Sequence, residues 1–530
     1  MTAMRSYELL LGKFLEHAAR WHGRGEVVTG GGAGAATHRI SYAALHTQAS
    51  ALSGALLALG IAPGDRIATL AWNSQAHMEC WYAAVGIGVS YHTLNPRIGI
   101  AQMADMVRQA HDRLLIASPD QANMVEALVK QCPSIEQVVI LDEPGGDEFP
   151  LPECGALRVW RLAELRAALG APVPWGGFAE DAEAALCFTS GTTGAPKGVP
   201  YAHRSTYLMI LDLLQTDVLG IGRADVVLAA VPMFHANAWG LPYAAPAVGA
   251  KLVLPGRHND GAALAALIVA EGVTVAIGVP TVWLGLVDHL EATGSHVPSL
   301  QRVILGGSSV PQALMDRIEQ RLGVVVQTSW GMTELSPLGT VSPASAQPRS
   351  ARVSGRPPVG VDLRLVDYAG MALPDQRSGE GQLQVRGASV IDRYLGHDTP
   401  AGDAGGWFDT GDLATIDDDG NLTITGRSKD LIKSGGEWIN PGEIEAIVGA
   451  LPAVGLVAVL GRPHPKWTEG PVVVIEPRAG QSVSEEDVVH ALEGKVPRWW
   501  MPDAVLSVAR MPLAMTGKVD KRALRETCGF

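Results

Sequence analysis

Residues 184–198 read AALCFTSGTTGAPKG. The apolar run Ala184–Phe188 predicts a buried strand, and a polar, glycine-rich segment follows it directly. From Phe188 to Gly198 there are four hydroxyl side chains, three glycines and one lysine. Glycines let the backbone approach an anion closely, N–H groups and hydroxyls donate to its oxygens, and lysine adds positive charge. The stretch therefore predicts a loop that holds a polyphosphate.

Two other interpretations of this loop are weaker. A flexible Gly/Thr linker is the usual reading of such a cluster, but here a buried strand precedes it and Pro196-Lys197-Gly198 follows. A Walker-type nucleotide hydrolase needs Gly-Lys followed by Ser or Thr at the start of a helix. Because Pro196 precedes Lys197 and Gly198 follows it, the Walker interpretation fails.

The sequence around this loop alternates strand and helix signals. A helix is expected after Pro311, with Leu314 and Ile318 on one face and Gly323 at its end. Apolar runs typical of strands lie at Val226–Val231, Val273–Val279, Arg302–Leu305 and Val324–Gln327. This alternation predicts an α/β fold with a large N-terminal domain of parallel sheets covered by helices.

A second domain is expected because 530 residues are too many for one hydrophobic core. The composition changes near residue 405, where Gly402–Gly406 is glycine-rich, and Gly426–Asp430 is charged. About 100 residues follow, enough for a small α+β domain. We therefore predict an N-terminal domain at 1–425, a hinge at 426–430 and a mobile C-terminal domain at 431–530.

The amino-acid composition argues against several classes of binding partner and cellular location. The net charge of -13 disfavours nucleic acid and anionic membranes as partners. The five cysteines are scattered and contain no CxxC pair, which fits a reducing compartment better than a disulfide framework or zinc site. No apolar run reaches the roughly 18 residues of a membrane span, and Met1–Trp21 carries acidic residues that argue against a targeting peptide. A cytoplasmic protein without a transmembrane segment is expected.

Further motifs along the chain identify a family. They are Trp330-Gly331-Met332-Thr333-Glu334, Phe408-Asp409-Thr410-Gly411-Asp412, the run Gly426–Glu445, and Pro512–Lys518. With the phosphate loop, and in this order, they resemble the adenylate-forming enzymes, which comprise acyl-CoA synthetases, luciferases and peptide-synthetase adenylation domains. The resemblance covers nearly the whole chain. It is closest to medium- and long-chain fatty acyl-CoA synthetases in the stretches 232–239 (PMFHANAW), 278–283 (GVPTVW) and 433–438 (KSGGEW).

The resemblance implies a site for ATP and Mg²⁺. Thr189 and the loop hydroxyls would hold the β- and γ-phosphates and help place Mg²⁺, to which Glu334 would supply a carboxylate. Thr333 would bond the α-phosphate, and Asp412 the ribose. Trp330 would stack on adenine. The implied nucleotide-binding residues are Thr189, Ser190, Gly191, Thr192, Thr193, Lys197, Gly307, Thr328, Ser329, Trp330, Thr333, Asp412, Arg427, Lys429 and Lys433.

Taken singly, several of these residues have ordinary structural explanations. Asp412 would be a turn residue after Gly411, Glu334 a solvated acid at a helix start, and Trp330 a core residue. Only their membership in ordered motifs favours the site.

The chemistry implied by the family is attack of a carboxylate on the α-phosphorus, which needs positive charge where the transition state develops charge. The resemblance assigns this role to Lys518 and places His235 near the reacting carboxylate, so the catalytic set is Lys518, His235, Thr333 and Glu334. The domain would then rotate about Lys429 and bring Lys433 to the site. The implied acyl and coenzyme A pocket contains Ala236, Trp239, Gly435, Gly436 and Trp438.

The expected function is ATP-dependent ligation of a carboxylic acid, in the medium- or long-chain fatty acid class, to coenzyme A, with AMP and pyrophosphate released. The substrates would be the acid, ATP and coenzyme A, and the family suggests a homodimer. A 3-methylthiopropanoate–CoA ligase or an aryl acid–CoA ligase is the main alternative. A luciferase-type oxygenase or a non-catalytic nucleotide-binding protein is more remote, the latter because Lys518 and Glu334 are both present.

Overall fold

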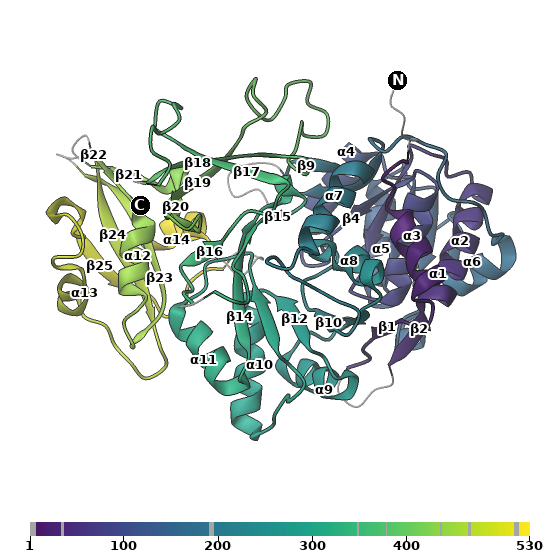
Figure 1. Ribbon diagram of the computed structural model, residues 1–530, viewed down its shortest axis with the longest axis horizontal. Helices are drawn as coiled ribbons and strands as arrows, with labels where there is room; N and C mark the ends of the chain where they lie inside the picture. The colour runs from purple at the N-terminus through teal and green to yellow at the C-terminus, as the bar shows by residue number, and fades with distance from the viewer. Residues whose placement is uncertain are drawn as a thin grey trace.

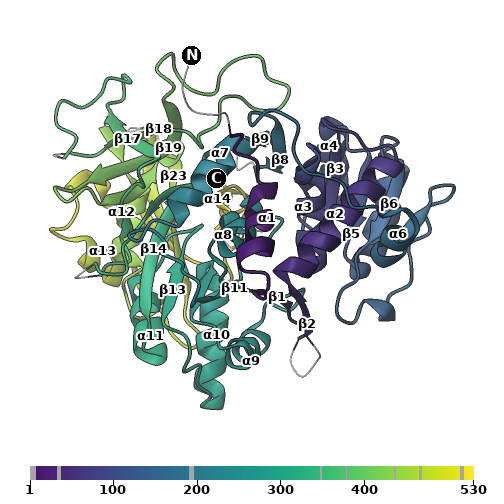
Figure 2. The same cartoon turned by 45° about the vertical axis from the view of Figure 1, so that its right-hand side comes forward.

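The computed structural model describes residues 7–32, 37–189, 196–346, 349–377, 379–434, 437–464, 468–513 and 519–530. Within these residues the chain forms four β-sheets with helices packed against them. The two larger sheets lie side by side, and the third separates them from the C-terminal end of the molecule (Figures 1 and 2).

The first sheet carries the strands expected from residues 226–327. It is parallel except at its edges, where β2 and β15 run antiparallel to their neighbours. Its described strands, in spatial order, are β15 (Leu338–Val341), β14 (Val325–Gly331), β13 (Arg302–Leu305), β12 (Val275–Gly278), β10 (Val226–Ala229), β11 (Lys251–Leu254), β1 (Glu26–Thr29) and β2 (His38–Ser41). The four predicted runs correspond to β10, β12, β13 and β14.

Helices cover one face of this sheet with apolar side chains. They are α9 (Gly261–Glu271), α10 (Pro280–Thr293) and α11 (Gln312–Leu322). In α11, Met315 and Ile318 are buried, and the helix ends at Gly323, whose φ of 67° is the left-handed conformation that favours glycine. The predicted helix and its end signal are confirmed.

The second sheet holds the strand that leads into the phosphate loop. It is parallel apart from the last pair, β8 and β9. Its described strands, in spatial order, are β7 (Val159–Arg161), β6 (Gln137–Ile140), β5 (Leu114–Ala117), β3 (Arg66–Leu70), β4 (Ser90–Thr93), β8 (Glu183–Phe188) and β9 (Gly198–Ala202). One face packs against α4 (Ile100–Ala110) and α5 (Ala122–Gln131).

The main core lies between the two large sheets. Buried residues of both sheets join one apolar cluster there, with Trp81 and Tyr91 stacked at 4.3 Å between ring centroids. The helices that contribute to it or border it are α1 (Gly12–Trp21), α2 (Tyr42–Ala58), α3 (Gln75–Gly86), α6 (Leu162–Leu169), α7 (His203–Leu213) and α8 (Leu241–Val248). This shared core fixes the two sheets relative to each other.

The third sheet was not anticipated, because the N-terminal domain was expected to contain parallel sheets. All its pairings are antiparallel. Its described strands, in spatial order, are β16 (Val353–Gly355), β20 (Leu422–Arg427), β19 (Phe408–Ile416), β18 (Gly381–Gly387) and β17 (Val361–Val366). The motif that contains Asp412 lies on β19.

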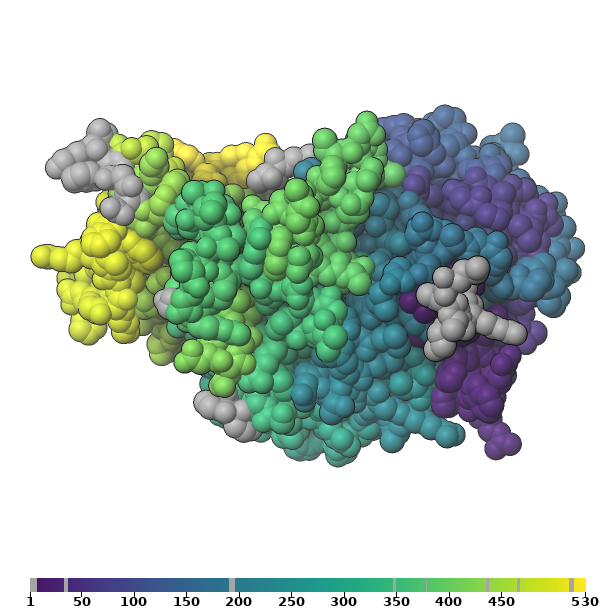
Figure 3. Space-filling model, turned by 45° about the horizontal axis from the view of Figure 1, so that its top comes forward, coloured from purple at the N-terminus to yellow at the C-terminus, as the bar shows by residue number. Residues whose placement is uncertain are grey.

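The C-terminal domain has its own mixed sheet and core, as predicted. Its strands are β21 (Ile432–Ser434), β22 (Glu437–Ile439), β23 (Val454–His464), β24 (Thr468–Pro477) and β25 (Ala504–Ser507). Its helices are α12 (Pro441–Val448), α13 (Glu485–Leu492) and α14 (Lys521–Cys528). The chain passes from the third sheet to this domain through the single turn η5 (Ser428–Asp430). Figure 3 shows the domain, in yellow, at one end of the molecule.

Two further features concern the whole described chain. Each of the five cysteines lies within it and is free; Cys80, Cys132 and Cys187 are buried, whereas Cys154 and Cys528 are partly exposed. Among the described helices, none is long and apolar enough to cross a membrane.

Candidate functional site

The phosphate loop lies at the turn of a β-hairpin formed by β8 and β9. At its mouth, the N–H of Thr189 donates to the carbonyl oxygen of Lys197 at 3.0 Å, and the N–H of Lys197 donates to Thr189 Oγ1 at 3.3 Å. These bonds close the two ends of the loop against each other. The predicted ligands Ser190, Gly191, Thr192 and Thr193 lie outside the described residues.

The ends of β13 and β14 bring Gly307, Thr328 and Ser329 together. The two strands are parallel, with Leu305 opposite Thr328. Ser329 Oγ donates to the carbonyl oxygen of Leu305 at 3.0 Å, and Thr328 Oγ1 donates to that of Val353. In sheets of this kind, ligands bind beyond the carboxyl ends of the strands. Because both hydroxyls donate to backbone carbonyl oxygens, Thr328 and Ser329 stabilise this end of the sheet.

A tryptophan and an arginine meet the carboxylate of Asp412, which is 2% exposed. Trp330 Nε1 donates to Asp412 Oδ2 at 3.0 Å, and Arg427 Nε lies 2.8 Å from Asp412 Oδ1. Trp330 comes from the first sheet, while Asp412 and Arg427 are paired residues of β19 and β20. The structure thus joins three predicted nucleotide-binding residues into one cluster. Each carboxylate oxygen has more than one lone pair, so Asp412 can accept further bonds.

Thr333 and Glu334 form the single turn η4 (Thr333–Leu335), and two tyrosines hold it. The hydroxyl of Tyr201, on β9, donates to the carbonyl oxygen of Thr333 at 2.7 Å. The hydroxyl of Tyr394 donates to Glu334 Oε1 at 3.0 Å. Burial raises the pKa of both phenols, and the carboxylate of Glu334 raises them further. Both therefore remain hydrogen-bond donors at neutral pH.

The segment after His235 has an unusual backbone. His235 is half-buried, and the next four residues, Ala236–Trp239, have φ between 44° and 54°. This left-handed conformation costs about 1–2 kcal/mol per residue for types other than glycine and asparagine, and such strain gathers at functional sites. Cys187 Sγ donates to Asn237 Oδ1 at 3.2 Å, which ties the segment to the end of β8. Burial raises the pKa of Cys187 to about 11, so its thiol stays protonated.

Trp239 packs its ring against the backbone next to β13. A Cβ placed on Gly306 would lie 2.8 Å from Trp239 Cη2, and one on Gly307 would lie 3.7 Å from Cζ2. Gly307 has a φ of 82°, so the backbone conformation favours glycine there. The predicted acyl-pocket residue Trp239 and the predicted adenine-site residue Gly307 are therefore neighbours.

Of the predicted residues in the C-terminal domain, the structure describes Lys433 and Trp438, and both are exposed. Burial lowers the pKa of Lys429, in η5, and Arg427 and Lys521 lower it further, against an opposing effect of Asp430. Lys433 is exposed, with Nζ 5.3 Å from the centroid of the Trp438 ring. Gly435, Gly436 and Lys518 lie outside the described residues.

Sequence reasoning missed Tyr201 and Tyr394, because the local sequence gives little or no signal for them. Tyr201 follows the phosphate loop by a few residues, and its position on a strand beside the loop is its only signal. Tyr394 lies in an irregular connection between β18 and β19. Both contacts join residues far apart in the chain, which residue spacing cannot reveal.

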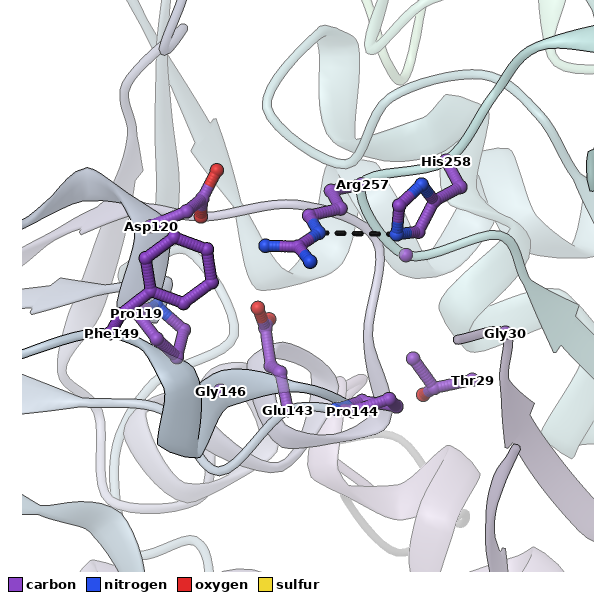
Figure 4. A pocket seen from close by; sticks show the side chains of 11 residues that line it. Thr29, Gly30, Pro119, Asp120, Glu143, Pro144, Gly146, Phe149, Arg257 and His258 are labelled. Carbon is purple, nitrogen blue, oxygen red and sulfur yellow. Dashed lines mark hydrogen bonds between the residues drawn. The ribbon is translucent and has the colours of Figure 1, made fainter. Parts of the chain in front are cut away.

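A pocket between the two large sheets contains none of the predicted site residues (Figure 4). Its charged groups have partners of their own: Asp120 accepts from Trp72 Nε1 at 3.0 Å, and Glu143 Oε1 accepts from Ser74 Oγ at 2.6 Å. Arg257 Nε donates to His258 Nε2 at 3.1 Å. Burial raises the pKa of Glu143 to about 7. This pocket is part of the seam between the sheets, away from the predicted chemistry.

The described residues fit Mg²⁺ bound together with a nucleotide. Among them, no group of three His, Cys, Asp or Glu side chains could hold a metal ion alone. Mg²⁺ usually binds through one or two carboxylates together with substrate phosphates, and Glu334, 8% exposed near the phosphate loop, offers such a carboxylate.

The fold is α/β with a separate C-terminal domain that has a mixed sheet, and residues predicted to bind a nucleotide lie near one another in it. A family model described as AMP-binding enzyme matches residues 14–395, and one described as AMP-binding enzyme C-terminal domain matches residues 443–518. The chain belongs to this family of AMP-binding enzymes.

Relatives match over almost the full length. The chain is 41% identical to a 3-methylmercaptopropionyl-CoA ligase of Ruegeria lacuscaerulensis, covering 99% of this chain and 98% of the relative. It is 39% identical to a medium-chain-fatty-acid–CoA ligase of Ectopseudomonas oleovorans, with coverage of 99% and 97%. Among solved structures, ATP-bound MatB from Rhodopseudomonas palustris superimposes with a TM-score of 0.84 at 26% identity, covering 98% of this chain and 99% of that chain. The predictions of an AMP-forming acyl-CoA ligase that uses ATP and coenzyme A are confirmed.

Proposed function

We propose that the protein activates an aliphatic carboxylic acid, in the medium- to long-chain fatty acid class, and transfers its acyl group to coenzyme A. The observation that carries this proposal is the convergence of separate motifs. The phosphate-loop hairpin meets the Thr333–Glu334 turn through Tyr201, Trp330 meets Asp412, and Trp239 packs beside Gly307. Residues predicted to bind the nucleotide and the acid thus lie near one edge of the first sheet, which supports the proposal.

In the first half-reaction, a carboxylate oxygen attacks the α-phosphorus of ATP and the bond to pyrophosphate breaks. Asp412 would hold the ribose, Trp330 the adenine, and Thr189 and Lys197 the phosphates. Glu334 and Thr189 would hold Mg²⁺, which when bound neutralises charge on the triphosphate. Lys518 would place its ammonium where negative charge develops, with His235 beside the acid. The product is an acyl-adenylate.

In the second half-reaction, the thiol sulfur of coenzyme A attacks the acyl carbon and AMP leaves. We propose that the domain at 431–530 turns about the hinge at 426–430 relative to residues 1–425, because Lys518 would obstruct the incoming thiol. The single turn η5 between two sheets supports this hinge, since a few connecting residues can absorb a large change in φ and ψ. Lys433, Gly435, Gly436 and Trp438 would then line the thiol path.

The acid is identified by a panel assay. Purified protein is incubated with ATP, Mg²⁺ and acids from acetate to palmitate, with 3-methylthiopropanoate and benzoate included, and pyrophosphate and AMP are followed with and without coenzyme A. We expect rapid AMP formation that requires coenzyme A and peaks with medium- or long-chain acids. If no acid in the panel releases pyrophosphate, the proposal is wrong.

A short thioether acid is the second candidate. The chain is 41% identical to the 3-methylmercaptopropionyl-CoA ligase and 39% identical to the medium-chain enzyme, so sequence identity does not favour the medium-chain enzyme. The bulky ring of Trp239 beside Gly307 would suit a short chain if it stays in place when the acid binds. A rate that peaks with 3-methylthiopropanoate and falls for longer acids would favour this candidate.

We further propose that the protein works in a reducing compartment, the cytoplasm, as its five free cysteines suggest. A homodimer is proposed from the family resemblance alone. Light scattering on the purified protein would measure its mass against the 55.7 kDa of one chain.

A further inference from the structure

Tyr394 lies between two groups that the proposed mechanism uses. Its hydroxyl is 3.0 Å from Glu334 Oε1, and Lys197 Nζ lies 4.8 Å from the centroid of its ring. Lys197 ends the phosphate loop, while Glu334 is the carboxylate offered to Mg²⁺. One half-buried side chain thus contacts both, with its polar end on one and its aromatic face on the other.

Backbone bonds fix Tyr394 in this place. On one side of it, the N–H of Ile391 donates to the carbonyl oxygen of Glu334 at 2.8 Å. On the other side, the N–H of Leu395 donates to the carbonyl oxygen of Gly198 at 2.8 Å. A Cβ on Gly198 would lie 2.9 Å from Leu395 Cβ, so glycine allows this close approach. The segment 391–395 therefore spans from the Glu334 turn to the end of the phosphate loop.

The chemistry of the contact suits a carboxylate that must keep one orientation. An ionised carboxylate only accepts hydrogen bonds, and a phenol has one O–H to donate. With Oε1 fixed by Tyr394, Glu334 keeps Oε2 for another partner. A cation over an aromatic face is attracted by the ring, which steadies the Lys197 ammonium.

We propose that Tyr394 is a positioning residue that orients Glu334 for Mg²⁺ and couples this carboxylate to Lys197 of the phosphate loop. The inference rests on the proposed function, because it assumes that Glu334 binds the metal of a metal–nucleotide complex. Groups that hydrogen-bond a metal-ligating carboxylate typically change metal affinity or activity about 10–100-fold when removed.

The test measures metal binding directly, without acid or coenzyme A. Mn²⁺ replaces Mg²⁺, the nucleotide is an ATP analogue with a methylene group between the α- and β-phosphorus, and free Mn²⁺ is followed by its electron paramagnetic resonance signal. We expect Tyr394→Phe, which keeps the ring and removes the hydroxyl, to weaken Mn²⁺ binding about 10–100-fold. Tyr394→Leu removes the ring as well, so it should also weaken binding of the analogue in the absence of metal.

Two controls separate positioning from a general effect on folding. Tyr42→Phe removes the hydroxyl of a buried tyrosine, which donates to the carbonyl oxygen of Ala250. This variant should leave the Mn²⁺ affinity unchanged. In a Glu334→Gln background, Tyr394→Phe should cause no further loss of Mn²⁺ affinity, because the group that it orients is gone. Melting temperatures without ligand show whether each variant is folded.

The outcomes distinguish the inference from the function beneath it. If the unmodified protein binds Mn²⁺ with the analogue and Tyr394→Phe binds it equally well, the inference is overturned while the proposed function stands. Equal losses from Tyr394→Phe with and without the Glu334 carboxylate would also overturn it, since they would show a role independent of Glu334. If the unmodified protein binds no Mn²⁺ with the analogue, the metal site itself is wrong and the inference falls with it.

Discussion

The N-terminal and C-terminal sides of the candidate site are held in different ways. On the N-terminal side, Asp412, Thr328 and Glu334 are 2%, 4% and 8% exposed, and each is bonded to a residue distant in the sequence. On the C-terminal side, Lys433 is exposed and Trp438 is 41% exposed. The residues on the N-terminal side are thus held in place by the fold, whereas those on the C-terminal side lie at the protein surface.

Contacts between the described residues of the two sides include one hydrogen bond and one pair of stacked rings. Asn440 Nδ2 donates to Glu380 Oε2 at 3.1 Å, and the rings of Tyr368 and Trp438 stack with centroids 6.1 Å apart. Burial raises the pKa of Glu443, and the nearby charge of Glu380 raises it further, so like charges also meet here. The comparison teaches that the described residues on the N-terminal side are fixed by buried bonds, while those on the C-terminal side lie exposed, as the proposed domain rotation requires.

The largest expected effect comes from the C-terminal side. Lys518→Ala should slow formation of the acyl-adenylate about 10²–10³-fold, because removal of one group that stabilises transition-state charge typically costs about 2.7–4 kcal/mol. Pyrophosphate release in a single turnover measures it, with the exposed Lys495→Ala as the matched control. Thioester formation from supplied acyl-adenylate should remain. If Lys518→Ala slowed both half-reactions equally, the proposal that the C-terminal domain turns between them would be contradicted.

An intermediate effect is expected from the buried N-terminal cluster. Asp412→Asn removes the charge that pairs with Arg427, and a hydrogen bond to a charged group contributes about 1.5–3 kcal/mol. ATP binding, measured by calorimetry, should therefore weaken roughly 10–100-fold. Asp418→Asn, an exposed turn residue of the same sheet, is the control and should bind ATP normally. Unchanged affinity in Asp412→Asn would remove this residue from the site.

The smallest effect tests the strained segment that borders the acyl side. Ala238 has a φ of 48° and is fully buried. Ala238→Gly should change the free energy of unfolding by between zero and a gain of about 1 kcal/mol, because glycine adopts this conformation without strain but costs more entropy to order. Ala265→Gly, inside α9, should instead lose about 1 kcal/mol. Chemical denaturation measures both. A comparable loss in Ala238→Gly would show that the segment is not strained.

Much of the fold could be predicted because its signals are local. Apolar runs marked β10, β12, β13 and β14, and Gly323 marked the end of α11. The antiparallel sheet was missed although its pattern is present: residues 361–365 alternate apolar and polar side chains, as a half-buried strand does. The motifs located Trp330, Glu334 and Asp412 in sequence. Their partners Tyr201 and Tyr394 depend on chain segments that meet only in the folded protein.

The left-handed segment at 236–240 shows another limit of local signals. Asn237 and Gly240 are residue types that tolerate this conformation, but Ala236, Ala238 and Trp239 give no hint of it. The surrounding packing imposes the backbone there. Sequence spacing could place these residues near the acid but could not predict their geometry.

The distribution of cysteines makes the chain a natural subject for distance measurement by fluorescence. Cys154 lies in the N-terminal region and Cys528 at the end of α14, and these are the two partly exposed thiols among five that the structure describes. Burial raises the pKa of both, so maleimide dyes would react with them faster at mildly alkaline pH. A donor and an acceptor attached there would report the separation of the two domains during turnover, with no cysteine added or removed.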